Sequence, residues 1–321
     1  MMIRSVYRFI KKRLNNFYIS PSIKALKALP GRGAVCLLDI GAAGEVEPRW
    51  KPFIQFLNYV GVEPDERSRS TILNIKADFR SYQILPYALA AKAQSLNFNL
   101  CRKPQVSSLY EPNVAFLSRF PDVDRFDVVE KIPTGCVSLD SVDVPNIDFL
   151  KLDIQGAECD VLKGAESILA SAVGLEVEVE FIELYKEQPL FGDICKALSQ
   201  QEFEFIDFVN LNRWGRDAHS GYGQCVFGDA LFLKSPEAMI HQSFDKKKWS
   251  AYFAVLIIYR RFDLIEIALE NISEDVKSDF ENFRLVFHKA KQKDLTVRKI
   301  HEILNGFLSL FNVTYRSHLI Q

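Results

Sequence analysis

The stretch LLDIGAAG at residues 37–44 decides the fold, because an apolar strand ends there in an acid and a glycine turn. Glycine lets the backbone approach a ligand closely, since it has no side chain and tolerates positive φ. Such turns also serve dinucleotides, so the glycines alone do not identify a ligand. Asp39, however, stands two residues before Gly41, where dinucleotide sites place an apolar residue. A carboxylate at this position can receive an ammonium group, directly or through water.

A second acid ends the next apolar run, in the sequence YVGVEPD at residues 59–65. Glu63 is placed to accept hydrogen bonds from both hydroxyls of a ribose. Its distance from Asp39 along the chain suits one strand-helix-strand unit. An acid for an ammonium group and an acid for a ribose together favour S-adenosylmethionine. The alternative is that the glycines serve only turn geometry and that the acids are solvated strand ends.

Short apolar runs separated by segments of helical length continue along the chain, which is the rhythm of a parallel α/β sheet. Seven strands are predicted, at residues 35–40, 58–63, 71–75, 149–154, 174–181, 203–208 and 229–234. The alternating sequence FDVVEKIPTGCVSLD at 126–140 predicts an inserted hairpin between the third and fourth strands. We therefore expect a seven-stranded, mostly parallel sheet with helices on both faces.

Helical periodicity dominates after residue 236, with few glycines or prolines to interrupt it. The chain is long enough for one catalytic-size domain with a substantial appendage. We predict three segments: a basic amphipathic helical segment at 1–33, an α/β domain at 34–235 and a helical C-terminal extension at 236–321.

The sequence DFLKLDIQGAE at residues 148–158 contains a strand with charged residues on one face. The period of two places Lys151, Asp153 and Gln155 together, opposite an apolar face. Central parallel strands are normally apolar on both faces, so a buried Lys and Asp need a partner or a functional site. Ligands in open α/β sheets bind beyond the carboxyl ends of the strands, where Asp153 would lie. Alternatively, an ion pair of Lys151 with an acid merely ties the strand to a helix.

Over residues 35–235 the sequence resembles the FkbM family of methyltransferases. The resemblance rests on LLDIGAAG followed by PRW, on GVEPDERS, SSLYEPN and VSLDS, and above all on DFLKLDIQGAECDVLKGA and EVEVEFIELYKEQPLFGDI. The Lys-x-Asp-x-x-Gly-x-Glu pattern is quite specific for that family. One departure is the glycine turn, which in many members reads Asp-x-Gly-Ala-Asn-x-Gly. The region 236–321 has no counterpart in the family core.

The resemblance implies a class I, Rossmann-like methyltransferase fold with S-adenosylmethionine as methyl donor. It implies O-methylation of a hydroxyl on a sugar, a glycan or another small-molecule natural product. The cofactor residues are then expected to be Asp39, Gly41, Ala42, Gly44 and Glu63. The positions nearest the chemistry are expected to be Lys151, Asp153 and Glu158.

For the chemistry we expect Asp153 to act as base, assisted by Glu158, with Lys151 positioning it or offsetting its charge. Alternatively, Asp153 holds a divalent cation such as Mg²⁺ that binds the acceptor hydroxyl. His219, in a glycine-containing loop, is a rival base. Two other functions stay open: a binding platform without turnover whose helical tail mediates interactions, and a nicotinamide-dependent oxidoreductase. The second is disfavoured by Asp39 and by the absence of a full Gly-x-Gly-x-x-Gly turn.

The formal net charge of −1 gives no indication of a nucleic-acid partner. The six cysteines are scattered without paired spacing, which predicts reduced thiols and a cytoplasmic location. No acidic residue precedes Asp39, and apolar residues recur at helical spacing among the basic residues of 3–17. A helix there can contact an anionic membrane surface, or it can cap the active site or pack on the sheet. The terminal helices can form a homodimer interface.

Overall fold

The computed structural model describes residues 19–43, 46–66, 68–69, 78–216, 223–242 and 244–309. By its internal contacts the chain divides into two compact units. One unit consists of residues 35–46 and 57–239, and the other of residues 1–34, 47–56 and 240–321.

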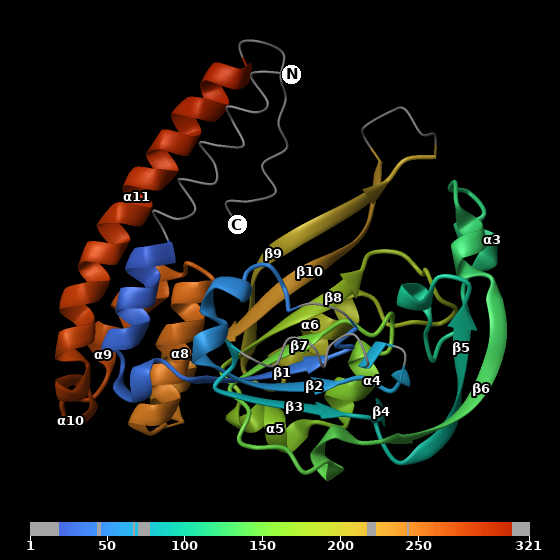
Figure 1. Ribbon diagram of the computed structural model, residues 1–321, viewed down its shortest axis with the longest axis horizontal. Helices are drawn as coiled ribbons and strands as arrows, with labels where there is room; N and C mark the ends of the chain where they lie inside the picture. The colour runs from blue at the N-terminus through green and yellow to red at the C-terminus, as the bar shows by residue number, and fades with distance from the viewer. Residues whose placement is uncertain are drawn as a thin grey trace. The chain divides into compact units, whose positions relative to one another are not determined.

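A seven-stranded sheet forms the centre of the first unit, with the order β3-β2-β1-β7-β8-β10-β9 (Figure 1). The strands are β1 (Val35–Ile40), β2 (Leu57–Val62), β3 (Ser81–Leu85), β7 (Phe149–Leu152), β8 (Gly174–Glu180), β9 (Phe203–Trp214) and β10 (Gln224–Lys234). The pairs from β3 to β8 are parallel, whereas β10 runs antiparallel to both of its neighbours. The expected mostly parallel sheet of a class I fold is confirmed.

The third strand of this sheet differs from the predicted one. The predicted run 71–75 lies outside the described residues, and β3 at the edge of the sheet consists of Ser81–Leu85. This strand is only partly buried along its length, so it lacks the continuous apolar run that marks the central strands. By contrast, every residue of β1 and β7 is buried, Asp39 and Lys151 included.

An inserted three-stranded sheet follows β3, with the order β4-β6-β5. Its strands are β4 (Ala88–Leu89), β5 (Gln94–Cys101) and β6 (Val128–Val137), and β5 pairs with β6 as the predicted antiparallel hairpin. Figure 1 shows this sheet on the side of the unit toward which β1, β2 and β3 point. Short helical turns lie between β5 and β6, namely η4 (Pro104–Val106), α3 (Val114–Leu117) and η5 (Val123–Phe126), and η6 (Leu139–Ser141) follows β6.

Helices pack on the main sheet through one apolar core. They are α4 (Glu158–Lys163), α5 (Glu166–Ser171) and α6 (Phe191–Ser199). Leu38, Leu150 and Leu175 of three adjacent strands meet Val161 and Leu169 of the first two helices there. Burial of such side chains contributes roughly 1.5–3 kcal/mol each, which holds the strand ends in fixed positions.

The second unit is helical, as predicted for the C-terminal extension. After α7 (Pro236–His241) come α8 (Lys246–Ile258), α9 (Phe262–Asn271), α10 (Glu274–Lys277), η7 (Ser278–Phe280) and α11 (Glu281–Ser309). Residues 19–28 are also helical, and η1 (Pro30–Arg32) and η2 (Lys51–Phe56) belong to this unit. The Trp50 indole donates a hydrogen bond to the Tyr259 hydroxyl at 3.2 Å. Within the described part of the chain, no helix combines the length and apolarity that a membrane crossing requires.

Candidate functional site

The carboxyl ends of β1, β2 and β7 bring the predicted site residues together. In the parallel register, Asp39 of β1 lies between Gly61 of β2 and Lys151 of β7. Glu176 of β8 follows Lys151 in the same row. Paired residues of parallel strands face the same side of a sheet, so these side chains share one face.

Asp39 is a buried carboxylate with an unused acceptor atom. Its side chain accepts a hydrogen bond from the Tyr59 hydroxyl at Oδ2, at 2.7 Å. Oδ1 is buried and has no hydrogen-bond partner among the described residues. Burial raises the pKa of Asp39, while the Lys151 ammonium and the Tyr59 hydroxyl oppose this shift. A buried carboxylate oxygen without a donor is costly, and a cationic ligand group would satisfy it.

Gly41 follows β1 in a backbone conformation that glycine alone adopts readily, with φ of 82°. A Cβ atom at this position would lie 1.9 Å from the Asp153 carbonyl oxygen. The amides of Gly41 and Ala42 both donate to the Val62 carbonyl, at 3.0 and 3.2 Å. Glycine at this position therefore lets the Asp153 backbone pack closely against the end of β1, and the two N–H groups are already used within the sheet. Gly44 lies outside the described residues.

Glu63 directly follows β2 and is 6% exposed. Its Oε1 accepts a hydrogen bond from the Asp65 amide at 2.8 Å. The Arg69 guanidinium donates to the Glu63 carbonyl at 2.9 Å, which fixes the chain beyond the strand. Burial raises the pKa of Glu63 to about 7, against the opposing effects of the Asp65 amide and Arg69. The carboxyl group is suited to accept hydrogen bonds from ligand hydroxyls once it is ionised.

A small pocket with an apolar lining lies at these strand ends, and its volume is about 50 Å³. That volume is well below the roughly 300–1,000 Å³ that is typical of small-molecule sites, so the pocket would enclose only part of such a ligand. The main sheet and the loop before α4 contribute Ile40, Gly41, Val62, Pro64, Ile154 and Ala157. The inserted segment contributes Tyr87, Ala88, Leu89, Phe98 and Leu109. A flat apolar group such as a nucleobase suits this lining.

Asp153 follows β7 and is held from two sides. The Lys151 ammonium lies 3.2 Å from Asp153 Oδ2, and Gln155 Nε2 donates to Oδ1 at 3.0 Å. The Lys151 side chain is 8% exposed and the Asp153 side chain 35%. Although burial opposes it, the Lys151 charge and the hydrogen bonds hold the pKa of Asp153 below its usual value. Asp153 is thus ionised at neutral pH and accessible to a ligand.

Gln155 links this carboxylate to a second one. Its Nε2 also donates to Glu178 Oε2 at 2.6 Å, and its Oε1 accepts a hydrogen bond from the Tyr185 hydroxyl at 3.1 Å. Burial, and then the nearby Asp153 charge, raise the pKa of Glu178 well above its usual value. Gln155 has a φ of 60°, and such rare backbone conformations concentrate at functional sites. Apart from the Gln-Gly pair, no pattern in the sequence predicts this geometry.

Glu158 closes the loop between β7 and α4. Its two carboxylate oxygens accept hydrogen bonds from the amides of Ile154 and Gly156, at 2.7 and 2.9 Å. The residue is 2% exposed, and burial raises its pKa to about 7. Both acceptor atoms are therefore bound to backbone near Asp153, which suits a role in shaping the loop.

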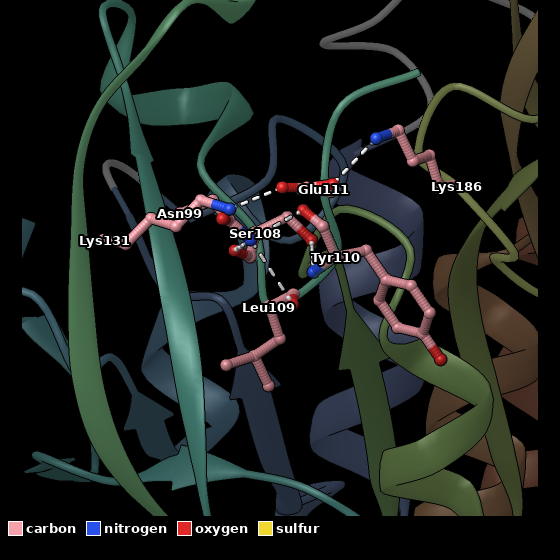
Figure 2. Close-up of polar contacts among 7 residues, drawn as sticks. All are labelled: Asn99, Ser108, Leu109, Tyr110, Glu111, Lys131 and Lys186. Atoms are coloured by element: carbon pink, nitrogen blue, oxygen red, sulfur yellow. Dashed lines mark hydrogen bonds and ion pairs between the residues drawn. The ribbon is translucent and has the colours of Figure 1, made fainter.

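The segment Ser107–Tyr110 connects the insertion to the same loop, and Figure 2 shows its residues Ser108, Leu109 and Tyr110 beside Asn99. Asn99 Nδ2 donates to the carbonyls of Ser108, Leu109 and Tyr110 within 3.4 Å. The Ser108 hydroxyl donates to the Gln155 carbonyl at 2.6 Å, and Ser107 Oγ accepts from the Cys101 amide at 3.0 Å. These hydroxyls hold the segment in place and thereby present Leu109 to the pocket.

An exposed ion-pair group borders this segment. Figure 2 shows Glu111 between Lys131 of β6 and Lys186 of the loop after β8. Lys186 Nζ lies 2.7 Å from Glu111, and Lys131 forms the second ion pair. The two ammonium groups lower the pKa of Glu111 to about 2. The group connects the insertion to the main sheet's loops.

Two further predictions concern a metal and a histidine. Among the described residues, no group of three or more His, Cys, Asp or Glu side chains is arranged to hold a metal ion. The described residues around Asp153 therefore do not form a site for the divalent cation that was the alternative there. His219, the rival base, lies outside the described residues.

Comparison with known proteins identifies one family. The profile described as "Methyltransferase FkbM domain" matches residues 40–205. A comparison with curated proteins finds no match.

Two solved structures illustrate the structural likeness. Methyltransferase FkbM from Methylobacillus flagellatus KT is 15% identical, with 61% of this chain and 44% of that chain covered and a TM-score of 0.37. Magnesium protoporphyrin IX methyltransferase from Synechocystis PCC 6803 with bound SAM is 9% identical, with 70% and 79% covered and a TM-score of 0.35. The chain spans less than half the length of the first of these proteins.

Proposed function

Because the chain belongs to the FkbM methyltransferase family, we propose that it transfers a methyl group to a hydroxyl of a sugar, a glycan or another small molecule. S-adenosylmethionine is the methyl donor of this family. The observation that supports the proposal most is the meeting of Asp39, Gly41 and Glu63 at adjacent strand ends, next to Asp153.

The described residues fit this cofactor. Asp39 Oδ1, buried and without a partner among them, would accept a hydrogen bond from the ammonium group. Glu63 would accept hydrogen bonds from the ribose hydroxyls, and Gly41 lets the Asp153 backbone lie close to the end of β1. The apolar pocket lining, with Leu109 and Ile154, would contact the adenine ring.

The cofactor supplies an electrophilic methyl group on a sulfonium, and the transfer is an in-line displacement. The protein has to hold the acceptor hydroxyl in line and to accept its proton as the new C–O bond forms and the S–C bond breaks. Asp153 is ionised and 35% exposed, so it can orient the hydroxyl and take the proton. Lys151 keeps the carboxylate ionised, while Gln155 and Glu158 fix the loop around it.

The test is methyl transfer by the full chain from methyl-labelled S-adenosylmethionine to a panel of glycans and small alcohols. We expect label in at least one hydroxyl-bearing compound, and a loss of about 100-fold or more in rate for Asp153→Asn, within the range typical of acid–base catalysis. Unchanged turnover in Asp153→Asn would exclude Asp153 as base. Label found only on amine-bearing control compounds would contradict O-methylation.

The predicted basic helical segment covers residues 1–33. Of these, residues 1–18 lie outside the described part of the chain. We propose a peripheral contact of this segment with an anionic membrane, since its basic residues and apolar spacing suit such a surface. The test is cosedimentation of the full chain with anionic liposomes, compared with a chain lacking residues 1–20. Equal sedimentation of the two chains would contradict the contact.

A further inference from the structure

Strand β2 and the residue directly after it present three residues to the site on one face, because side chains of extended backbone alternate with a period of two. Tyr59, Gly61 and Glu63 share this face. Tyr59 is 2% exposed, and its ring stacks on Tyr82 with a centroid distance of 5.4 Å and an interplanar angle of 11°. A second ring, Phe79, packs against it at 5.1 Å. The Tyr59 ring is therefore fixed by its neighbours.

The Tyr59 ring packs against Gly61 on the side of β2 that faces β1. A Cβ atom at Gly61 would lie 3.1 Å from Tyr59 Cε1 and 2.6 Å from Ile84 Cδ1. Since Gly61 is also the register partner of Asp39, the ring passes beside the residue that faces this carboxylate. Because Gly61 has no side chain, the Tyr59 hydroxyl has room to reach Asp39 on the neighbouring strand.

The Tyr59 hydroxyl acts on the orientation of Asp39. It donates to Oδ2 at 2.7 Å, so that oxygen is occupied and the carboxylate plane is fixed. The other oxygen, Oδ1, is left buried with no donor among the described residues. A hydrogen bond to the ionised form also favours that form, which opposes the effect of burial. Tyr59 thereby leaves one oriented, charged acceptor atom at the end of β1.

We propose that Tyr59 is a positioning residue, which holds the Asp39 carboxylate ready for the ammonium group at the amino-acid end of the cofactor. The inference rests on the proposed function, because it assigns one end of S-adenosylmethionine to Asp39. Tyr59 contacts Asp39 directly and would act on the cofactor through that carboxylate.

The test compares two ligands in the full chain by calorimetry. S-adenosylhomocysteine carries the ammonium group, whereas 5′-methylthioadenosine has the same nucleoside without the amino-acid part. We expect Tyr59→Phe to weaken S-adenosylhomocysteine about tenfold, since a hydrogen bond that orients a charged group is lost. The affinity for 5′-methylthioadenosine should stay within about twofold, because its nucleoside does not depend on Asp39.

Tyr259→Phe is a matched control, since it also removes the hydroxyl of a buried tyrosine, which accepts a hydrogen bond from the Trp50 indole at 3.2 Å in the second unit. This variant should bind both ligands as the wild type does. In an Asp39→Asn background, Tyr59→Phe should cause little further loss, which a double-mutant cycle measures. An equal loss for both ligands, or none for either, in Tyr59→Phe would overturn the role of Tyr59. A wild-type chain that binds neither ligand would instead contradict the proposed function itself.

Discussion

Asp39 contributes the one charged acceptor atom at the end of β1 that has no donor among the described residues. We predict that Asp39→Asn weakens S-adenosylhomocysteine binding by roughly 10–100-fold, since hydrogen bonds to charged groups contribute about 1.5–3 kcal/mol. Isothermal titration calorimetry measures this. Asp140→Asn is the control, because Asp140 accepts hydrogen bonds from the Ser167 and Ile168 amides at the start of α5. Equal affinities of Asp39→Asn and the wild type would refute the assignment.

Glu63 makes cofactor binding dependent on pH. Its pKa of about 7 follows from burial, so the carboxyl is largely protonated at pH 6 and ionised at pH 8. Only the ionised form accepts hydrogen bonds from both ribose hydroxyls, and we therefore expect affinity to rise about tenfold between these pH values.

The variant Glu63→Gln should bind more weakly and show a smaller slope, because its amide does not titrate. Glu66→Gln, at an exposed neighbouring position, should keep the slope of the wild type. The measurement is the dissociation constant of S-adenosylhomocysteine at several pH values. A slope that is unchanged in Glu63→Gln would show that another group titrates.

For single residues at the site, the sequence predicted some contacts and missed others. The burial of Asp39, Glu63 and Lys151 follows from their places at the ends of central strands or within them. The hydrogen bond from Tyr59 to Asp39 could have been predicted, since the period of two places Tyr59 and Glu63 on the same face. The left-handed backbone of Gln155 was not, because it depends on contacts to Glu178 and to distant loops.

The loop between β7 and α4 depends on Glu158 for its shape. We predict that Glu158→Ala lowers the free energy of unfolding by about 2–3 kcal/mol, because the Ile154 and Gly156 amides lose their acceptor. Glu166 is the matched control, since it likewise begins a short helix, α5, but is exposed. Glu166→Ala should change stability by less than about 0.5 kcal/mol. Chemical denaturation measures both, and equal effects would contradict a special role of Glu158.

The segment Ser107–Tyr110 is held by one side chain of β5. We predict that Asn99→Ala weakens S-adenosylhomocysteine binding about 3–10-fold, because the segment that presents Leu109 to the pocket loses its donor. Asn97→Ala on the same strand, at an exposed position, is the control. If both variants bind as the wild type does, the insertion does not shape the pocket.

Elements buried on both faces could be predicted from the sequence, and half-buried ones could not. The central strands are buried along their whole length and contain apolar runs interrupted only by single charged residues, so their positions were found to within a few residues. The edge strand β3 is half exposed, and its sequence SYQIL has too weak a pattern to identify it. The inserted hairpin was indicated by alternation in β6, but its pairing with β4 joins residues about fifty positions apart.

The division of the whole chain into two units could not be predicted from the sequence either. Residues 47–56 group with the helices of 240–321 although the sequence places them within the α/β part. The Trp50 to Tyr259 hydrogen bond joins residues 209 positions apart, and no local pattern indicates such a contact. The three predicted segments, 1–33, 34–235 and 236–321, therefore remain a proposal about domains.

The buried acids make the stability of the chain without cofactor dependent on pH. Burial raises the pKa of Glu63 and Glu158 to about 7, and raises those of Glu178 and Glu180 well above the usual value. The folded state then holds more protons than the unfolded state. Stability is fully present below about pH 4.5 for these groups and is lost as the pH rises through their folded pKa values. Asp153, with its lowered pKa, titrates below this window.

We therefore predict that the melting temperature falls between pH 5.5 and pH 8 in the absence of cofactor. Glu178→Gln should reduce this fall, because its amide stays neutral. Glu183→Gln, close to the carboxyl end of β8 but exposed, should leave it as in the wild type. A melting temperature that rises across this range would contradict the account of the buried acids.

The most direct test of the central claim is a crystal structure of the full chain with S-adenosylhomocysteine. The account predicts the ammonium group within hydrogen-bond distance of Asp39, the ribose hydroxyls on Glu63 and the adenine ring between Ile154 and Leu109. The sulfur atom should face Asp153. A nucleoside bound elsewhere, or with its ribose turned away from Glu63, would contradict the account.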